Sequence, residues 1–239
     1  MRNVWTIARR ELYAYFSSPI AYITMAAFLA VMGLLFWLFI RYYHEATMRD
    51  TLANGFTYFL LIFYSGVVTM RLLAEEQRSG TIELVLTAPV RDWELVAGKY
   101  LASLILFLAM TVITIYQPII LTSLGNPDLG ATTSGYLGFL LAGAALLAIG
   151  TLTSTFTRNQ VVAAILAIAI GVALWLIEYA GALSPGTFVG EFLSKLAFFS
   201  RYGDFADGLI DTQNIIYYLS VAAASLFVAT RVVEARRWR

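Results

Sequence analysis

The sequence has 239 residues, of which 60% are hydrophobic and only 13% are charged, and its formal net charge is +1. Soluble domains contain about 45–50% apolar and about 25% charged residues, so this composition excludes an ordinary soluble domain and predicts an integral membrane protein. The near-neutral charge gives no general attraction to nucleic acid, and the absence of cysteine excludes a disulfide framework, a thiol nucleophile and a thiolate metal site.

Residues 1–18 predict an amphipathic helix that lies along the membrane surface. Its apolar residues recur at helical spacing: Val4, Trp5, Ala8, Leu12, Tyr15 and Phe16. Arg9, Arg10 and Glu11 supply the charged side, with the arginines expected to face lipid headgroups. A cleaved signal peptide is the competing interpretation, but the apolar run that follows is too long and lacks a small-residue cleavage site.

Six uncharged runs are near the ~20 residues that a helix needs to cross ~30 Å of hydrocarbon. These predicted spans are residues 20–40, 52–70, 100–124, 134–156, 159–177 and 215–230. The four residues from Thr157 to Gln160 form the junction between the fourth and fifth spans. So short a connection predicts a tight antiparallel hairpin. An even number of spans places both termini on the same side of the membrane.

Residues 75–89 form a charged island between the second and third spans and must therefore lie in water. Gly80 and Thr81 can begin a short helix, Glu83 would occupy its first turn, and Pro89 would end it. Leu84 and Val85 follow Glu83, so one face of the helix is apolar. Such a helix could dock onto another protein, or it could be a turn covered by lipid headgroups.

The third to fifth spans carry two further signals. Pro118, which follows Gln117, removes a helix hydrogen bond and predicts a kink, either as a mobile joint or as a simple packing kink. The fourth and fifth spans are rich in glycine and alanine, including Gly143 and Gly150, which lets helix backbones approach closely. For the fourth span we expect this packing to occur within one chain.

The connection at residues 181–213 predicts an amphipathic helix after Ser184-Pro185-Gly186. Its apolar residues at helical spacing are Val189, Phe192, Leu193, Leu196 and Phe199. This face must contact lipid or other helices.

The distribution of basic residues predicts the orientation. If the N-terminus is inside, twelve of the 16 lysines and arginines fall on inner segments and four on outer ones: Arg41, Arg49, Lys195 and Arg201. By the positive-inside rule, both termini and the segment 75–89 are cytoplasmic.

The segment from Glu76 to Pro89 reads Glu-x-x-x-Gly-Thr-x-Glu-x-Leu-x-x-x-Pro, and Arg91-Asp92 and Gly98-Lys99-Tyr100 follow it. This pattern resembles the first cytoplasmic loop of ABC-2 type permeases, the membrane subunits of ATP-driven exporters. The resemblance implies that residues 82–87 are a coupling helix seated in a cleft of a separate cytoplasmic ABC ATPase. The ATPase-coupling residues would be Glu76, Gly80, Thr81, Glu83, Leu84, Leu86 and Pro89.

The resemblance extends to the rest of the chain. It implies that residues 1–18, with Arg9, Arg10 and Glu11, are an elbow helix that touches the ATPase. It also implies two short, partly re-entrant outer gate helices between the fifth and sixth spans, the second at residues 205–210. Their candidate residues are Phe192, Leu196, Phe199, Phe205 and Leu209. Residues 199–219 look like the end of gliding-motility-type permeases, a branch of ABC-2.

A phosphate-binding Walker A loop needs Gly-x-x-x-x-Gly-Lys-Ser/Thr, but Gly98-Lys99 is followed by Tyr100, and Trp93 stands in place of the earlier glycine. We therefore expect a non-enzymatic chain that binds no cofactor, with ATP and Mg on the partner ATPase. The prediction is an all-α, single-domain permease (residues 1–239) in the plasma (inner) membrane, working with a second permease chain, identical or related. An ATP-independent channel or an assembly scaffold is the alternative.

Overall fold

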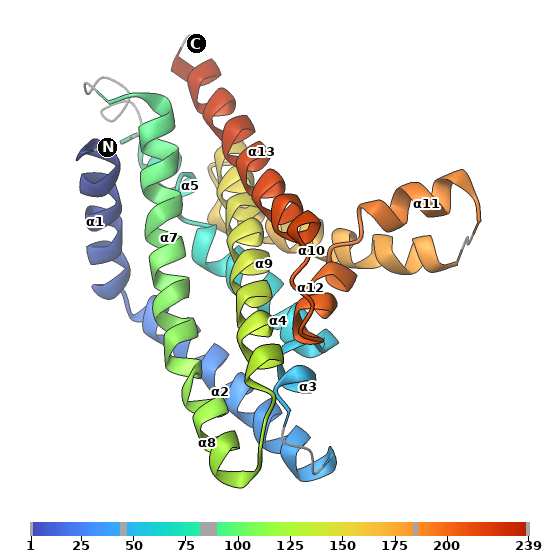
Figure 1. Cartoon of the computed structure of the whole chain (residues 1–239). Coiled ribbons are helices and arrows are strands. Elements are labelled where there is room, and N and C mark those ends of the chain that lie inside the picture. The colour runs from blue at the N-terminus through green and yellow to red at the C-terminus, as the bar shows by residue number, and fades with distance from the viewer. Residues whose placement is uncertain (1, 44–46, 82–89, 184–185, 238–239) are drawn as a thin grey trace.

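The structure is a computed structural model, and it describes all residues except 1, 44–46, 82–89, 184–185 and 238–239. Within these described ranges the regular elements are all helices, which confirms the all-α fold (Figure 1). They are α1 (Arg2–Phe16), α2 (Pro19–Tyr43), α3 (Arg49–Leu52), α4 (Gly55–Thr69), α5 (Ala74–Ser79), α7 (Asp92–Thr114), α8 (Tyr116–Leu124), α9 (Leu129–Phe156), α10 (Gln160–Ala182), α11 (Phe188–Lys195), α12 (Phe199–Ala206) and α13 (Thr212–Arg237).

Six helical segments are long and apolar enough to cross a membrane, as the sequence predicted. The third, at Asp92–Leu124, has 33 residues. At 1.5 Å per residue it is about 50 Å long, more than the ~30 Å of hydrocarbon that it has to cross. The first turns of α7 therefore extend beyond the apolar layer. The helix begins at Asp92, eight residues before residue 100, where the uncharged run predicts the start of the span.

Helix α9 lies at the centre of the bundle, in contact with α4, α7, α10, α12 and α13 (Figure 1). Its glycines permit these approaches. A Cβ on Gly143 would lie 2.2 Å from the ring of Phe107 on α7, and one on Gly150 would lie 2.1 Å from the hydroxyl of Thr69 on α4. The small residues of the fourth span thus serve packing within the chain, as expected.

The third membrane segment is interrupted at Ile115, between α7 and α8. Pro118 has no N–H to donate to the carbonyl of Thr114, four residues earlier. The hydroxyl of Tyr136 on α9 donates to this carbonyl instead, at 3.0 Å. The predicted kink is confirmed, and a side chain from a neighbouring helix satisfies the backbone group that the proline leaves free.

Helix α1 was expected to lie along the membrane surface, but Figure 1 shows it running alongside α7. Gly98 makes this close approach possible, because a Cβ there would lie 2.8 Å from Cβ of Ile7 and 2.9 Å from the Val4 carbonyl oxygen. The part of α7 beyond the apolar layer gives α1 a protein surface to pack on. The predicted helix is present, and its orientation differs from the prediction.

The connection between the fifth and sixth spans contains two short helices, but their bounds differ from the prediction. α11 ends at Lys195, so Phe199 does not share its apolar face and instead begins α12. The second helix was expected at residues 205–210, whereas α12 ends at Ala206, and Gly208 has a left-handed φ of 89°. Backbone in that region stops a helix, and Leu209 is left outside it with 62% of its surface exposed.

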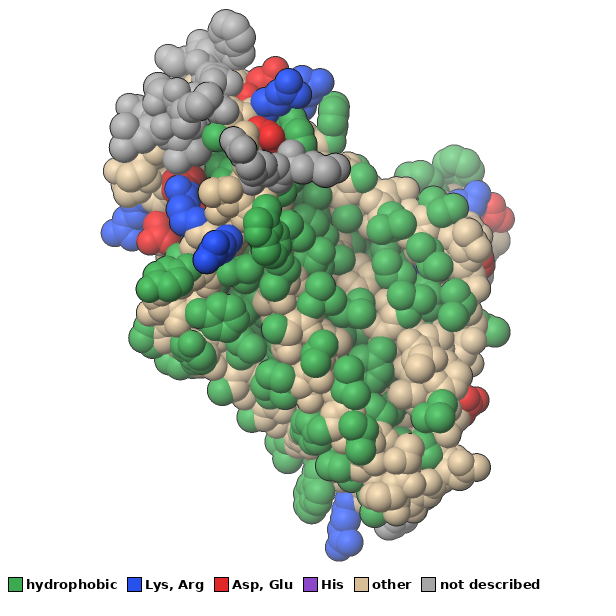
Figure 2. All heavy atoms as spheres, turned by 60° about the vertical axis from the view of Figure 1, so that its left-hand side comes forward, with side chains coloured by type: hydrophobic (Ala, Val, Ile, Leu, Met, Phe, Trp, Pro, Cys, Tyr) green, Lys and Arg blue, Asp and Glu red, His purple; other side chains and the backbone are tan. Residues whose placement is uncertain are grey.

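The surface is polarised in the way that a membrane requires. On the face drawn in Figure 2, most of the charged side chains gather at the upper end, a few lie along the right-hand edge and at the lower end, and the flank between them is largely hydrophobic. Large apolar side chains remain exposed along the spans, such as Trp37 on α2 and Ile165 on α10. Six apolar helices with this surface make the chain a multi-pass membrane protein.

Candidate functional site

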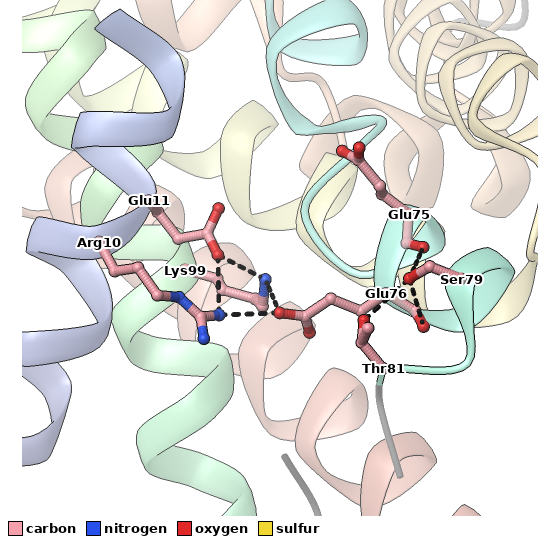
Figure 3. Close-up of polar contacts among 7 residues, drawn as sticks. All are labelled: Arg10, Glu11, Glu75, Glu76, Ser79, Thr81 and Lys99. Atoms are coloured by element: carbon pink, nitrogen blue, oxygen red, sulfur yellow. Dashed lines mark hydrogen bonds and ion pairs between the residues drawn. The ribbon is translucent and has the colours of Figure 1, made fainter. Parts of the chain in front are cut away.

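A cluster of four charged side chains joins three helices at the charged end of the molecule (Figure 3). Arg10 and Glu11 come from α1, Glu76 from α5 and Lys99 from α7; we call these the four-charge cluster. The Lys99 ammonium lies 2.8 Å from Glu11 Oε1 and 3.0 Å from Glu76 Oε1. Arg10 Nη2 lies 3.3 Å and 2.9 Å from the same two oxygens. Each carboxylate is therefore shared between two cations.

Because the cluster is buried, its stability depends strongly on the pairing of its charges. The side chain of Lys99 is 1% exposed, and those of Glu11 and Glu76 are 12% and 13% exposed. A charge removed from water is tolerated only when it is paired and hydrogen-bonded. Burial alone would raise the pKa of Glu11, but the charges of Lys99 and Arg10 outweigh it and hold that pKa below its ordinary value.

A second polar contact fixes α1 to the beginning of α7. Asn3 Nδ2 donates to Glu94 Oε2 at 3.0 Å, and the backbone N–H of Arg91 donates to the same oxygen at 3.0 Å. The second bond satisfies one of the free N–H groups near the start of a helix. Glu94 thus joins the N-terminal part of α1 to the first turn of α7 through one carboxylate oxygen.

The residue after Glu76 connects α5 in another direction. Gln77 is buried, and its Nε2 donates to the carbonyls of Ser154 and Thr155, at 3.3 and 3.1 Å, near the end of α9. Arg236 of α13 donates to Gln77 Oε1 and to the Thr155 carbonyl, both at 2.7 Å. The last carbonyls of a helix have no partner within it, so these contacts complete the end of α9.

Helix α5 is thus held on two sides through two consecutive residues. Glu76 links it to α1 and α7, and Gln77 links it to α9 and α13. α5 ends directly before the segment 82–89, and α7 begins shortly after it. The two helices that flank this segment, α5 and α7, are therefore bonded to each other and, directly or through one side chain, to α1, α9 and α13.

The structure describes some of the predicted coupling residues. Gly80 ends α5 with a left-handed φ of 72°, and the hydroxyls of Thr81 and Ser79 lie 2.8 Å apart. Gly80 is therefore the residue that stops α5, a position that favours glycine. Glu83, Leu84, Leu86 and Pro89, and the helix predicted at residues 82–87, lie outside the described residues.

Of the elbow-helix residues, Arg10 and Glu11 belong to the four-charge cluster, and Arg9 is exposed. The sequence interpretation missed three residues: Lys99, Gln77 and Arg236. A lysine directly at the edge of an apolar run, next to a glycine, was the available signal for the first. Nothing in the local sequence marks the other two.

The candidate gate residues fall into two groups. Phe205 is fully buried and Phe199 partly buried, whereas Phe192, Leu196 and Leu209 are exposed by 56%, 36% and 62%. Helix α12 is fixed by its polar bonds. Its first turn donates from the Ser200 N–H to Glu178 of α10 at 3.1 Å, and its Tyr202 hydroxyl donates to the Leu52 carbonyl at 2.7 Å.

Helix α11 packs on the end of α10, where the backbone N of Ser194 would lie 3.2 Å from a Cβ on Gly181. Its last residue, Lys195, accepts a hydrogen bond at 3.1 Å from Arg201 of α12. Figure 1 shows α11 and the end of α10 projecting from the side of the bundle. Among the described residues, no group of three or more His, Cys, Asp or Glu side chains could hold a metal ion.

A protein-family model matches most of the chain. The family model described as ABC-2 family transporter protein matches residues 14–230, which covers α2 to α13 almost completely and the end of α1. The comparison with curated proteins finds no match.

Proposed function

Because this chain belongs to the ABC-2 family of transporter proteins, and is thus a membrane subunit of an ABC transporter, we propose that it couples ATP hydrolysis by a separate ATPase to export. In this proposal the ATPase binds the segment 82–89. A second permease chain, identical or related, completes the pathway across the membrane.

The observation that carries the proposal is the double attachment of α5. A displacement of the segment 82–89 acts directly on α5, and Glu76 and Gln77 pass it to α1, α7, α9 and α13. Hydrogen-bonded and ion-paired side chains that connect rigid helices are a physical route for such coupling. A loop that served only to join two spans would not need buried bonds to four other helices.

Removing the apolar anchors of the segment tests this proposal. In Leu84→Ala with Leu86→Ala, we expect the ATPase to be released or uncoupled, because an apolar anchor at the centre of an interface contributes about 2 kcal/mol or more. Glu83→Ala should have a milder effect, since charges at the rim of an interface mainly alter association rate and salt dependence. The measurements are recovery of the complex between this chain and the partner ATPase, and the ATP turnover of that complex.

The matched control is Leu183→Ala with Leu129→Ala, which removes the same atoms from two exposed leucines far from the segment in the sequence. The control should leave complex recovery and turnover unchanged. Equal recovery and turnover in the Leu84/Leu86 variant would contradict coupling and favour the channel or scaffold alternative.

The proposal also requires α5 to be cytoplasmic, as the distribution of basic residues predicts. The chain has no cysteine, so single cysteines can be introduced at Arg78 on α5 and at Lys195 on α11 without a background. In intact cells, an impermeant thiol reagent should label position 195 and leave position 78 unlabelled until the cells are opened. The reverse pattern would invert the topology and exclude contact between this segment and a cytoplasmic ATPase.

A further inference from the structure

A groove of about 560 Å³ lies between the first turns of α7 and the last turns of α13. Trp93 and Val96 line it from α7, and Leu226 and Phe227 line it from α13. Arg91 and Arg231 line it from the charged end of the same two helices. The groove thus has apolar walls, and where the apolar part of the chain ends it has two guanidinium groups beside the carboxylates of Asp92 and Glu234.

The two arginines differ in what they already bind. Arg231 Nη1 lies 2.7 Å from Glu234 Oε2, and its guanidinium lies 5.0 Å from the centre of the Phe227 ring. The Arg91 side chain is exposed, and its charge acts on the nearby Glu94 carboxylate without a hydrogen bond from its guanidinium to a residue that the structure describes. A guanidinium binds phosphate oxygens through two parallel hydrogen bonds, so Arg91 is suited to a phosphate ligand.

The position of the groove indicates which class of ligand it binds. Leu226 and Phe227 belong to the sixth candidate span, and Arg231 is the first charged residue after its apolar stretch. Trp93 and Phe227 are 45% and 60% exposed, and tryptophan is characteristic of the boundary between hydrocarbon and headgroups. At this depth the surrounding phospholipids present a phosphate at the level of the arginines and acyl chains at the level of the aromatic rings.

We propose that the groove binds one phospholipid of the surrounding leaflet, with its phosphate on Arg91 and Arg231 and an acyl chain along Trp93, Val96 and Phe227. The lipid bridges α7 and α13, which are already in contact. The lipid lies on the exposed side of α7 and α13, apart from the four-charge cluster. The site rests on the predicted membrane crossing and does not depend on coupling to an ATPase.

The test uses the purified, delipidated chain in a sugar-based detergent. Dioleoylphosphatidylglycerol is compared with dioleoylglycerol, which has the same two chains and no phosphate, and bound lipid is counted by native mass spectrometry. We expect saturable binding of one phospholipid per chain, and binding of dioleoylglycerol that is weaker by about tenfold or more. In Arg91→Gln, phospholipid binding should fall by about tenfold, to the level of dioleoylglycerol.

Arg158→Gln is the matched control, because Arg158 is also exposed and belongs to the same predicted side of the membrane, but does not line the groove. It should bind phospholipid as the parent chain does. Trp93→Ala should weaken both lipids together, since it removes part of the acyl-chain wall. Equal binding of the two lipids by the parent chain, or equal losses in Arg91→Gln and Arg158→Gln, would overturn the proposal. Gel filtration confirms that each variant is folded.

Discussion

Replacement of Lys99 by methionine is expected to destabilise the protein by about 3–5 kcal/mol, the usual cost of removing one partner from a buried ion pair. Glu11 and Glu76 would remain nearly buried, with only the largely exposed Arg10 to neutralise them. The measurement is unfolding in detergent, by heat or by sodium dodecyl sulfate, followed by the fluorescence of the five tryptophans.

Two further variants separate charge from shape. Lys195→Met is the matched control, because Lys195 is the other lysine of the chain and is exposed. Lys99→Met combined with Glu11→Gln and Glu76→Gln should recover most of the lost stability, since it removes the uncompensated charges. If Lys99→Met were as stable as Lys195→Met, the four-charge cluster would not hold α1, α5 and α7 together.

The same loss should depend on pH. In the parent chain, the folded-state pKa of Glu11 lies below its ordinary value of 4.5, so its stabilising effect is full above about that pH and disappears as the pH falls through the lower folded value. Without Lys99, protonation of the carboxylate relieves the unpaired charge. The difference in stability between Lys99→Met and the parent chain should therefore shrink as the pH falls, first above pH 4.5, where the unpaired carboxylate of the variant takes up a proton, and then below it, where Glu11 of the parent chain does.

Gly143→Ala is expected to destabilise the packing of α7 on α9 by about 1–3 kcal/mol or more, as overpacking of a core does. The new Cβ would lie 2.2 Å from the ring of Phe107. That ring cannot move away easily, because it is fully buried and stacked on Phe139 with centroids 5.4 Å apart. The same unfolding measurement checks this result.

Gly203→Ala is the control for helix propensity, because Gly203 lies within α12 and a Cβ there meets no atom within 4 Å. It should be neutral or stabilising, as alanine favours a helix by about 1 kcal/mol over glycine. Phe107→Leu in the Gly143→Ala background should restore part of the lost stability. If Gly143→Ala were as stable as Gly203→Ala, α7 and α9 would not pack as closely as described.

The sequence predicted the six spans well, because each is a long uncharged run whose signal is local. The helix that contains the third span begins earlier than the predicted span, for a physical reason. Counting uncharged residues excludes Lys99, but α7 includes it, since Glu11 and Glu76 from distant segments neutralise its charge. The end of α12 was missed because Gly208 stops the helix there.

The candidate site was predictable only in part. A motif identified Glu76 and Gly80, and it continues through the segment 82–89. The ion pairs of Glu76 join residues that are far apart in the sequence. The same is true of the hydrogen bond between Arg236 and Gln77, which are 159 positions apart. No periodicity or composition within one segment contains such a pairing.

The order of synthesis adds a consequence to the four-charge cluster. Glu11 and Glu76 leave the ribosome before Lys99, and N-terminal segments can begin to fold during translation. Until the third membrane segment is made, both carboxylates have only Arg10 as a partner within the cluster. The arrival of Lys99 then makes the cluster neutral, so that its burial becomes favourable at the moment when α7 can take its place beside α1.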